Sequence, residues 1–239
     1  MFLKEVVATV DRELAERFPA VIVGRFSREE TCVTWPFSQL IRRKVQTIDD
    51  WKICVVFSDR FPTPTADSEL HPMALRYPFD FAAYAGESAF EKKQRILEGT
   101  TAACVLLAEQ RKWNSEAFRM ASERLLKDRF YFPFRSKKTW PSPDRRRTAR
   151  IVVEMDLDIA VAFLTVSEKV RENQPVKIRL LEMPSGPLAV AMEEKLAKSA
   201  GWLNDDEFRI VRGTKGIGRG ATNYVVSVSR QQTHVVAEL

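Results

Sequence analysis

Residues 151–166 read IVVEMDLDIAVAFLTV. Apolar side chains occupy every second position from Ile151 to Ile159, and the positions between them are mainly acidic. Alternation with a period of two is typical of a β-strand that buries one face. The stretch therefore predicts one long strand or a tight strand pair, and its polar second face favours antiparallel sheet.

The chain after this stretch continues the pattern of strands around one helix. Residues 176–183 predict another strand, and residues 207–211 and 223–228 predict a hairpin pair around a glycine-containing loop. Residues 187–200 predict a helix, because a proline opens it and a glycine follows its end. We expect the last residues, 231–239, to fray.

The chain before this stretch predicts helices on either side of a group of strands. Apolar residues at helical spacing predict an amphipathic helix over 1–18, and β-branched runs predict strands at 20–26, 31–35 and 51–58. Four prolines between 61 and 78 predict a loop or linker there. Two further helices, at 88–113 and from the capping residues Asn114 and Ser115 to about Lys127, predict a helical hairpin.

Segregated runs of helices and strands favour an α+β fold with mainly antiparallel sheet, an N-terminal amphipathic helix, a central helical hairpin and one C-terminal helix. At 239 residues, 45% of them hydrophobic, the chain is long enough to bury a substantial core. We expect a single domain over 1–239, with a possible subdivision near 60–78 into 1–60 and 79–239.

The three cysteines, Cys32, Cys54 and Cys104, are odd in number and lie in apolar runs, which predicts reduced core residues. Lys4 and Glu5 interrupt the stretch where a signal peptide needs an apolar region, and no apolar run has the length of a membrane span. We therefore expect a cytoplasmic, soluble protein without a membrane partner.

Positive charge is concentrated in one segment of the sequence. The formal net charge is +6, and nine basic against two acidic residues between Lys127 and Arg150 give this segment +7. Basic side chains interleaved with aromatic ones are the ingredients of single-strand and RNA binding. The alternative is a solvated turn that its aromatic side chains anchor to the core. The candidate anion-binding residues in the segment are Arg135, Lys137, Lys138, Trp140, Arg145, Arg146 and Arg147.

Trp140 is the tryptophan that we expect to be exposed, since it lies among prolines and lysines where its ring could anchor a partner. Lys215 and Arg219 add cations in the glycine-rich stretch 213–220. A strand rather than a helix is predicted after these glycines, so a cationic hairpin loop is favoured over a nucleotide-binding loop, and no dinucleotide cofactor is expected.

Glu154, Asp156 and Asp158 would share one face of a strand. Such carboxylates can hold a divalent ion, but the alternation that predicts the strand also explains them as its solvent face, which we favour. Residues 71 and 234, the only histidines, are isolated, and no nucleophile motif accompanies them.

These patterns favour a non-enzymatic protein, without a cofactor, that binds nucleic acid through the basic-aromatic segment, residues 130–147. An alternative of a different class is a protein-interaction module, such as an inhibitor, an adaptor or a toxin-neutralising protein, in which the same residues dock on an acidic protein surface. A metal-dependent nuclease that uses the three carboxylates is a second alternative.

Overall fold

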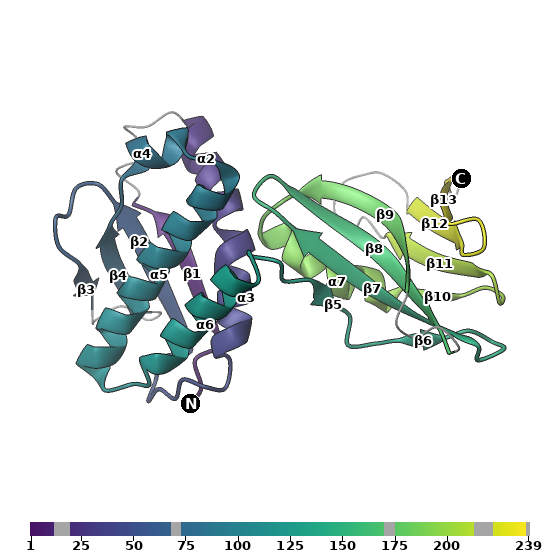
Figure 1. Ribbon diagram of the computed structural model, residues 1–239, viewed down its shortest axis with the longest axis horizontal. Coiled ribbons are helices and arrows are strands. Elements are labelled where there is room, and N and C mark those ends of the chain that lie inside the picture. Colours follow the sequence, from purple (N-terminus) through teal and green to yellow (C-terminus); the bar gives the residue numbers. More distant parts are fainter. Residues whose placement is uncertain (12–19, 68–72, 170–174, 213–221, 238–239) are drawn as a thin grey trace. The chain divides into compact units, whose positions relative to one another are not determined.

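A computed structural model describes residues 1–11, 20–67, 73–169, 175–212 and 222–237. The contacts between these residues divide the chain into two compact units (Figure 1). The first unit comprises Met1–Phe132 with Asp156–Asp158, and the second comprises Pro133–Met155 with Ile159–Leu239. The interval 60–78, where the sequence suggests a possible subdivision, lies inside the first unit.

The first unit is built on a four-stranded sheet in the order β1-β2-β4-β3. Its strands are β1 (Glu5–Val10), β2 (Lys52–Ser58), β3 (Thr65–Asp67) and β4 (Met73–Pro78). β1 and β4 both run parallel to β2, and β3 is antiparallel to β4. Parallel neighbours need a crossover connection, and helices supply it between β1 and β2.

Helices of the first unit pack on this sheet (Figure 1). They are α2 (Ala20–Glu29), α3 (Thr31–Ile41), α4 (Phe81–Gly86), α5 (Ala89–Arg111) and α6 (Glu116–Lys127). A capping box between Ser88 and Glu91 starts α5. The fully buried ring of Phe26 lies 5.4 to 5.9 Å from four other aromatic rings, so an aromatic cluster joins α2 and α4 to the sheet.

The second unit contains two antiparallel sheets and one described helix. The first sheet comprises β5 (Phe134–Arg135), β6 (Trp140–Pro141), β7 (Arg147–Met155), β8 (Ile159–Glu168) and β9 (Val176–Pro184). The second comprises β10 (Gly201–Trp202), β11 (Glu207–Arg212), β12 (Thr222–Ser227) and β13 (Gln232–Ala237). Helix α7 (Pro187–Lys198) and one face of each sheet enclose a common apolar core.

The predicted α+β class with mainly antiparallel sheet is confirmed. Residues 151–166 form the predicted strand pair, since β7 and β8 are antiparallel neighbours. The strands β2 and β9, the helical hairpin α5–α6, the proline-led α7 and the pairing of β11 with β12 also agree with the sequence.

Several predictions of local structure, most of them in the N-terminal part, are wrong. Glu5–Val10 forms β1 instead of part of an amphipathic helix, whereas the predicted strands at 20–26 and 31–35 lie within α2 and α3. The predicted proline-rich loop contains β3 and β4, and the expected frayed end contains β13. Short β-branched runs fit either structure, and long-range pairing decides between them.

Gly99 in the middle of α5 is a packing requirement rather than a weak point of the helix. A Cβ atom at this position would lie 2.8 Å from the ring of Phe57, whereas a Cβ at Gly24 in α2 would meet nothing within 4 Å. Alanine improves helix propensity at both positions, by up to about 1 kcal/mol. At Gly99 the clash opposes that gain.

We therefore predict opposite effects of two glycine-to-alanine substitutions. Gly24→Ala should raise the free energy of unfolding by about 0.5–1 kcal/mol. Gly99→Ala should lower it by about 1 kcal/mol, because overpacking costs about 1–3 kcal/mol. Urea denaturation of both variants measures the difference, and equal stabilisation by the two substitutions would contradict the packing of α5 on β2.

Candidate polyanion-binding site

The basic-aromatic segment, residues 130–147, runs from the end of the first unit into the first sheet of the second unit. β5 and β6 are short strands that both pair with β7, and Arg135 is opposite Val152 in the register. Ser136 fixes the connection between them, because its backbone N–H donates to the carbonyl of Ile151 at 2.9 Å. The segment is thus held along the sheet edge by backbone pairing.

Trp140 is buried, so the expectation of an exposed ring is wrong. Its side chain is part of the apolar core, and the residue is only 6% exposed. The ring meets Phe208 edge to face at 5.5 Å, and the carbonyl of Trp140 accepts a hydrogen bond of 2.9 Å from the Trp202 indole. Trp140 therefore anchors the segment and does not offer a stacking surface to a ligand.

The basic side chains before and after Trp140 are exposed to solvent. The exposed basic residues of the segment that the sequence singles out are Arg135, Lys137, Lys138, Arg145 and Arg146. Lys138 also lies over the Trp140 ring, 5.3 Å from its centroid. Thr139 and Pro141, the direct neighbours of Trp140, are exposed as well, as the alternation of an extended backbone requires.

A tight turn presents Arg145 and Arg146. The Asp144 carboxylate accepts hydrogen bonds from the Ser142 hydroxyl at 2.6 Å and from the Arg146 backbone N–H at 3.0 Å. Arg145 takes a positive φ of 58° at the turn. The Arg146 side chain is 87% exposed and, among the described residues, makes one long ion pair of 3.9 Å, with Asp144, so its charge remains available to a ligand.

Arg147 has a different environment, although it follows Arg146 directly. Its guanidinium forms ion pairs with Glu168 at 3.4 Å and with Asp206 at 3.2 Å, and it donates to the carbonyl of Asp205 at 3.1 Å. The side chain is 26% exposed. Arg147 therefore joins the end of β8 to the β10–β11 turn, and its charge is already balanced within the second unit.

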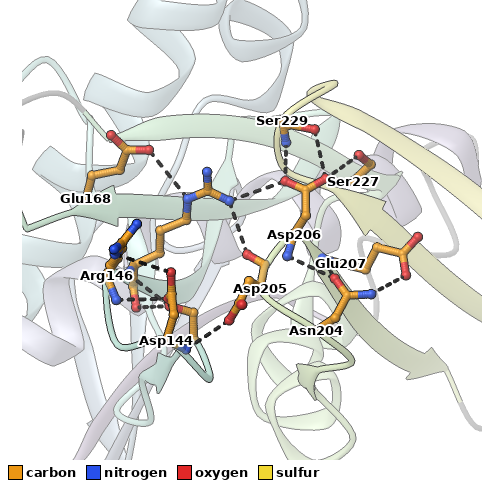
Figure 2. A network of polar contacts seen from close by, with 11 residues as sticks. Asp144, Arg146, Glu168, Asn204, Asp205, Asp206, Glu207, Ser227 and Ser229 are labelled. Atoms are coloured by element: carbon orange, nitrogen blue, oxygen red, sulfur yellow. Dashed lines mark hydrogen bonds and ion pairs between the residues drawn. The ribbon is translucent and has the colours of Figure 1, made fainter.

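Asp206 is the centre of this network. Its carboxylate accepts hydrogen bonds from the side chains of Ser227 and Ser229 and from the Ser229 backbone N–H (Figure 2). Hydrogen bonding by Ser229 is the largest cause that lowers the pKa of Asp206, and Ser227 and Arg147 lower it further. Ser142 and the backbone of Arg146 likewise lower the pKa of Asp144. The arginine turn thus lies among ionised carboxylates.

The three candidate metal ligands do not share one strand face. Glu154 lies on β7, but Asp156 and Asp158 lie after its end, so the single-face prediction is wrong. Glu154 pairs with Lys177 at 2.6 Å, Asp156 with Lys93 at 2.7 Å and Asp158 with Arg25 at 3.2 Å. Over the described ranges, no group of three metal-ligating side chains is found.

The cysteines are reduced, as predicted, and two of them are fully shielded. Burial raises the pKa of the Cys32 and Cys104 thiols above the ordinary value, and it also raises that of Cys54, which is less buried. A protonated thiol is a poor nucleophile. Lys215 and Arg219 lie outside the described residues.

Two basic residues that the sequence did not single out, Lys177 and Arg179, lie on the same sheet face as Arg135. Across four neighbouring strands, Arg135, Val152, Phe163 and Arg179 occupy opposing positions, so they lie on one face. Lys177, two residues before Arg179 on the same face, places its Nζ 3.9 Å from the Phe163 ring centroid. The alternation of basic and apolar residues in β9 is the signal that could have found them.

Comparison with protein-family models, with curated proteins and with solved structures finds no match to this chain. Of the helices in the described part of the chain, none combines the length and the apolar character needed to cross a membrane.

The lowered pKa of Asp206 predicts that the free energy of unfolding decreases in acid. Because the folded pKa lies below the ordinary value of 3.8, ionisation of Asp206 stabilises the fold above that pH, and this contribution is lost as the pH falls through the folded pKa. Asp206→Asn should therefore lower the thermal midpoint at pH 6 and have a smaller effect near pH 2.

Thermal denaturation of the wild type and Asp206→Asn at both pH values measures this difference. Asp205→Asn is the matched control, since within the described part of the chain the neighbouring carboxylate accepts one hydrogen bond, from the Asp144 backbone N–H. An equal loss of stability at the two pH values would contradict the role assigned to the Asp206 charge.

Proposed function

We propose that this protein binds a polyanion, specifically nucleic acid, through the exposed cations of the basic-aromatic segment. The observation that carries the proposal is the solvent exposure of Arg135, Lys137, Lys138, Arg145 and Arg146 on a backbone fixed by sheet pairing. A backbone that is already ordered adds little to the conformational entropy lost when these cations meet phosphates. Phosphate contacts of this kind supply affinity without sequence readout.

The proposed contact in the second unit is electrostatic, because the Trp140 ring is in the core; Tyr131, which is 60% exposed, belongs to the first unit. Arg135 extends the surface toward Arg179 and Lys177 on the same sheet face. Glu154 and Glu182 pair with Lys177 and Arg179, which reduces the positive charge there. We therefore assign the main phosphate contacts to the segment itself. The reduced cysteines accord with a cytoplasmic location, which we include in the proposal.

One observation favours a second candidate function. Around the arginine turn, Asp144, Asp205, Asp206 and Glu168 intermix negative with positive charge. Surfaces of mixed sign suit charge-complementary protein partners, whereas nucleic acid repels the carboxylates. On this reading, the segment belongs to a protein-interaction module, and Arg145 and Arg146 contact carboxylates of the partner.

Binding of labelled single- and double-stranded DNA and RNA over a salt series tests the proposal. Removal of two phosphate contacts by Arg145→Ala/Arg146→Ala should reduce the slope of log affinity against log salt by about 1.4 for a single strand. Fluorescence anisotropy measures both affinity and slope. Neither side chain is buried, so the variant should fold normally.

The matched control is Arg119→Ala/Arg124→Ala, which removes two arginine charges that are already paired with Glu109 and Asp128. This variant should keep the wild-type slope. The nucleic-acid proposal fails if no oligonucleotide binds at low salt, or if both double variants change the slope equally. A protein partner that is lost only with Arg145→Ala/Arg146→Ala would support the second candidate instead.

A further inference from the structure

Exposed apolar side chains gather at the N-terminal edge of the first unit, far along the sequence from the basic-aromatic segment. Phe2 is 48% exposed, Trp51 is 46% exposed and Ile48 is 84% exposed. Met1, at 56%, extends the same group. Large apolar side chains that cluster in water instead of packing inside are typical of binding surfaces. We call Met1, Phe2, Ile48 and Trp51 the apolar patch.

Backbone pairing brings the four residues of the apolar patch together. Phe2 forms a β-bridge with Gln46, the backbone N–H of Thr47 donates to the carbonyl of Met1 at 2.8 Å, and that of Lys4 donates to the carbonyl of Trp51 at 2.8 Å. Between these contacts, Val45 and Thr47 are buried while Ile48 points to solvent. Buried Val45 and Thr47 therefore anchor the connection between α3 and β2, and Ile48 on the same connection is exposed to solvent.

Cations surround the apolar patch. Arg42, Arg43 and Lys44 follow the end of α3 directly, and Asn114 donates to the carbonyl of Lys44 at 3.4 Å, which brings the end of α5 close to them. The exposed cations of this basic rim are Lys4, Arg42, Arg43, Lys44, Arg111 and Lys112. None of them forms an ion pair with another described residue, in contrast to Arg147.

The acidic side chains nearby do not neutralise the positive charge of the basic rim. Glu5 is committed to Lys52 at 3.1 Å, and Asp50 is buried, so Asp49 is the exposed carboxylate on this connection. Favourable interaction with helix dipoles explains why cations follow the ends of α3 and α5. It does not explain why Ile48 and Trp51 stand exposed beside them.

We propose that the apolar patch and the basic rim form a docking surface for an acidic amphipathic segment of a partner protein. Apolar side chains of the partner would cover Ile48, Trp51 and Phe2, and its carboxylates would meet Arg42, Arg43 and Lys44. This pairing follows from charge complementarity. It also follows from the usual structure of protein interfaces, in which an apolar centre is surrounded by a polar rim and an amphipathic helix binds through its apolar face. The surface lies wholly in the first unit and is independent of the polyanion proposal.

Other partners fit this surface less well. Nucleic acid would use the cations and the Trp51 ring, but the aliphatic side chains of Ile48 and Met1 have no counterpart on a phosphate backbone. A second copy of the chain docked symmetrically on the same face would place basic rim against basic rim, which is repulsive. An acidic, apolar protein segment satisfies both the patch and the rim.

A phage-displayed library of helical peptides, selected on the immobilised full chain, tests the proposal. We expect the enriched peptides to combine Asp or Glu with Leu, Phe or Trp. Anisotropy of a labelled enriched peptide should then show a loss of affinity of about tenfold or more with Ile48→Asp, since a central apolar contact of an interface is costly to remove. The separate variant Arg42→Glu/Arg43→Glu should also bind the peptide more weakly, and the affinity that remains should depend less on salt concentration.

Leu188→Asp is the matched control, because Leu188 is 70% exposed on α7 in the second unit. This variant should bind the peptide like the wild type. Ile48 is almost fully exposed, so Ile48→Asp should keep the wild-type circular dichroism spectrum and thermal midpoint.

Three results would overturn the proposal. The first is selection without enrichment, the second is enrichment of peptides that lack acidic residues, and the third is equal affinity of the enriched peptide for wild type and Ile48→Asp. Loss of oligonucleotide binding with Arg42→Glu/Arg43→Glu, without any effect of Ile48→Asp on peptide affinity, would assign the rim to nucleic acid.

Discussion

Burial of the Trp140 ring is the constraint on which the presentation of the basic-aromatic segment depends. The ring packs against Phe208, and its backbone carbonyl binds the Trp202 indole, so the middle of the segment is tied to the second sheet of its unit. Pairing of β5 and β6 with β7 holds the rest. The lysines and arginines on either side of this anchor lie in water, where a polyanion can reach them.

The same framework divides the arginine triplet by role. Arg145 and Arg146 stand on a turn that Asp144 and Ser142 hold, whereas Arg147 is a structural cross-link between β8 and the β10–β11 turn. Partly exposed ion pairs contribute little to stability individually, but this one belongs to a network with several hydrogen bonds. Treating the triplet as one uniform basic patch would therefore overstate its free charge.

The sequence predicts elements whose signals are local. The helix predicted over 88–113 matches α5, and the alternation from Ile151 onward marks the β7–β8 pair. The error over Glu5–Val10 has a physical origin, because Val6 and Val10 fit a helical stripe as well as one face of a strand. What decides β1 is its parallel pairing with β2, more than forty residues away, and that pairing leaves no local trace.

The site is predictable to a lesser extent than the fold. The alternative interpretation as a solvated turn agrees with the exposure of Arg145 and Arg146, but the partners of Arg147, Glu168 and Asp206, are distant in the chain. The burial of Trp140 likewise depends on Phe208, which the sequence alone does not connect to it. Side chains that are charged or aromatic obtain their roles from such tertiary neighbours.

The central claim is that Trp140 is a buried anchor and that exposed cations beside it bind nucleic acid. Titration of isotope-labelled protein with a single-stranded oligonucleotide, followed by NMR of backbone amides and tryptophan indoles, tests both parts together. The account predicts shifts of the amides around Lys137, Arg145 and Arg146, with the Trp140 indole unchanged. A large ring-current shift of the Trp140 indole, or shifts confined to residues outside the segment, would contradict it.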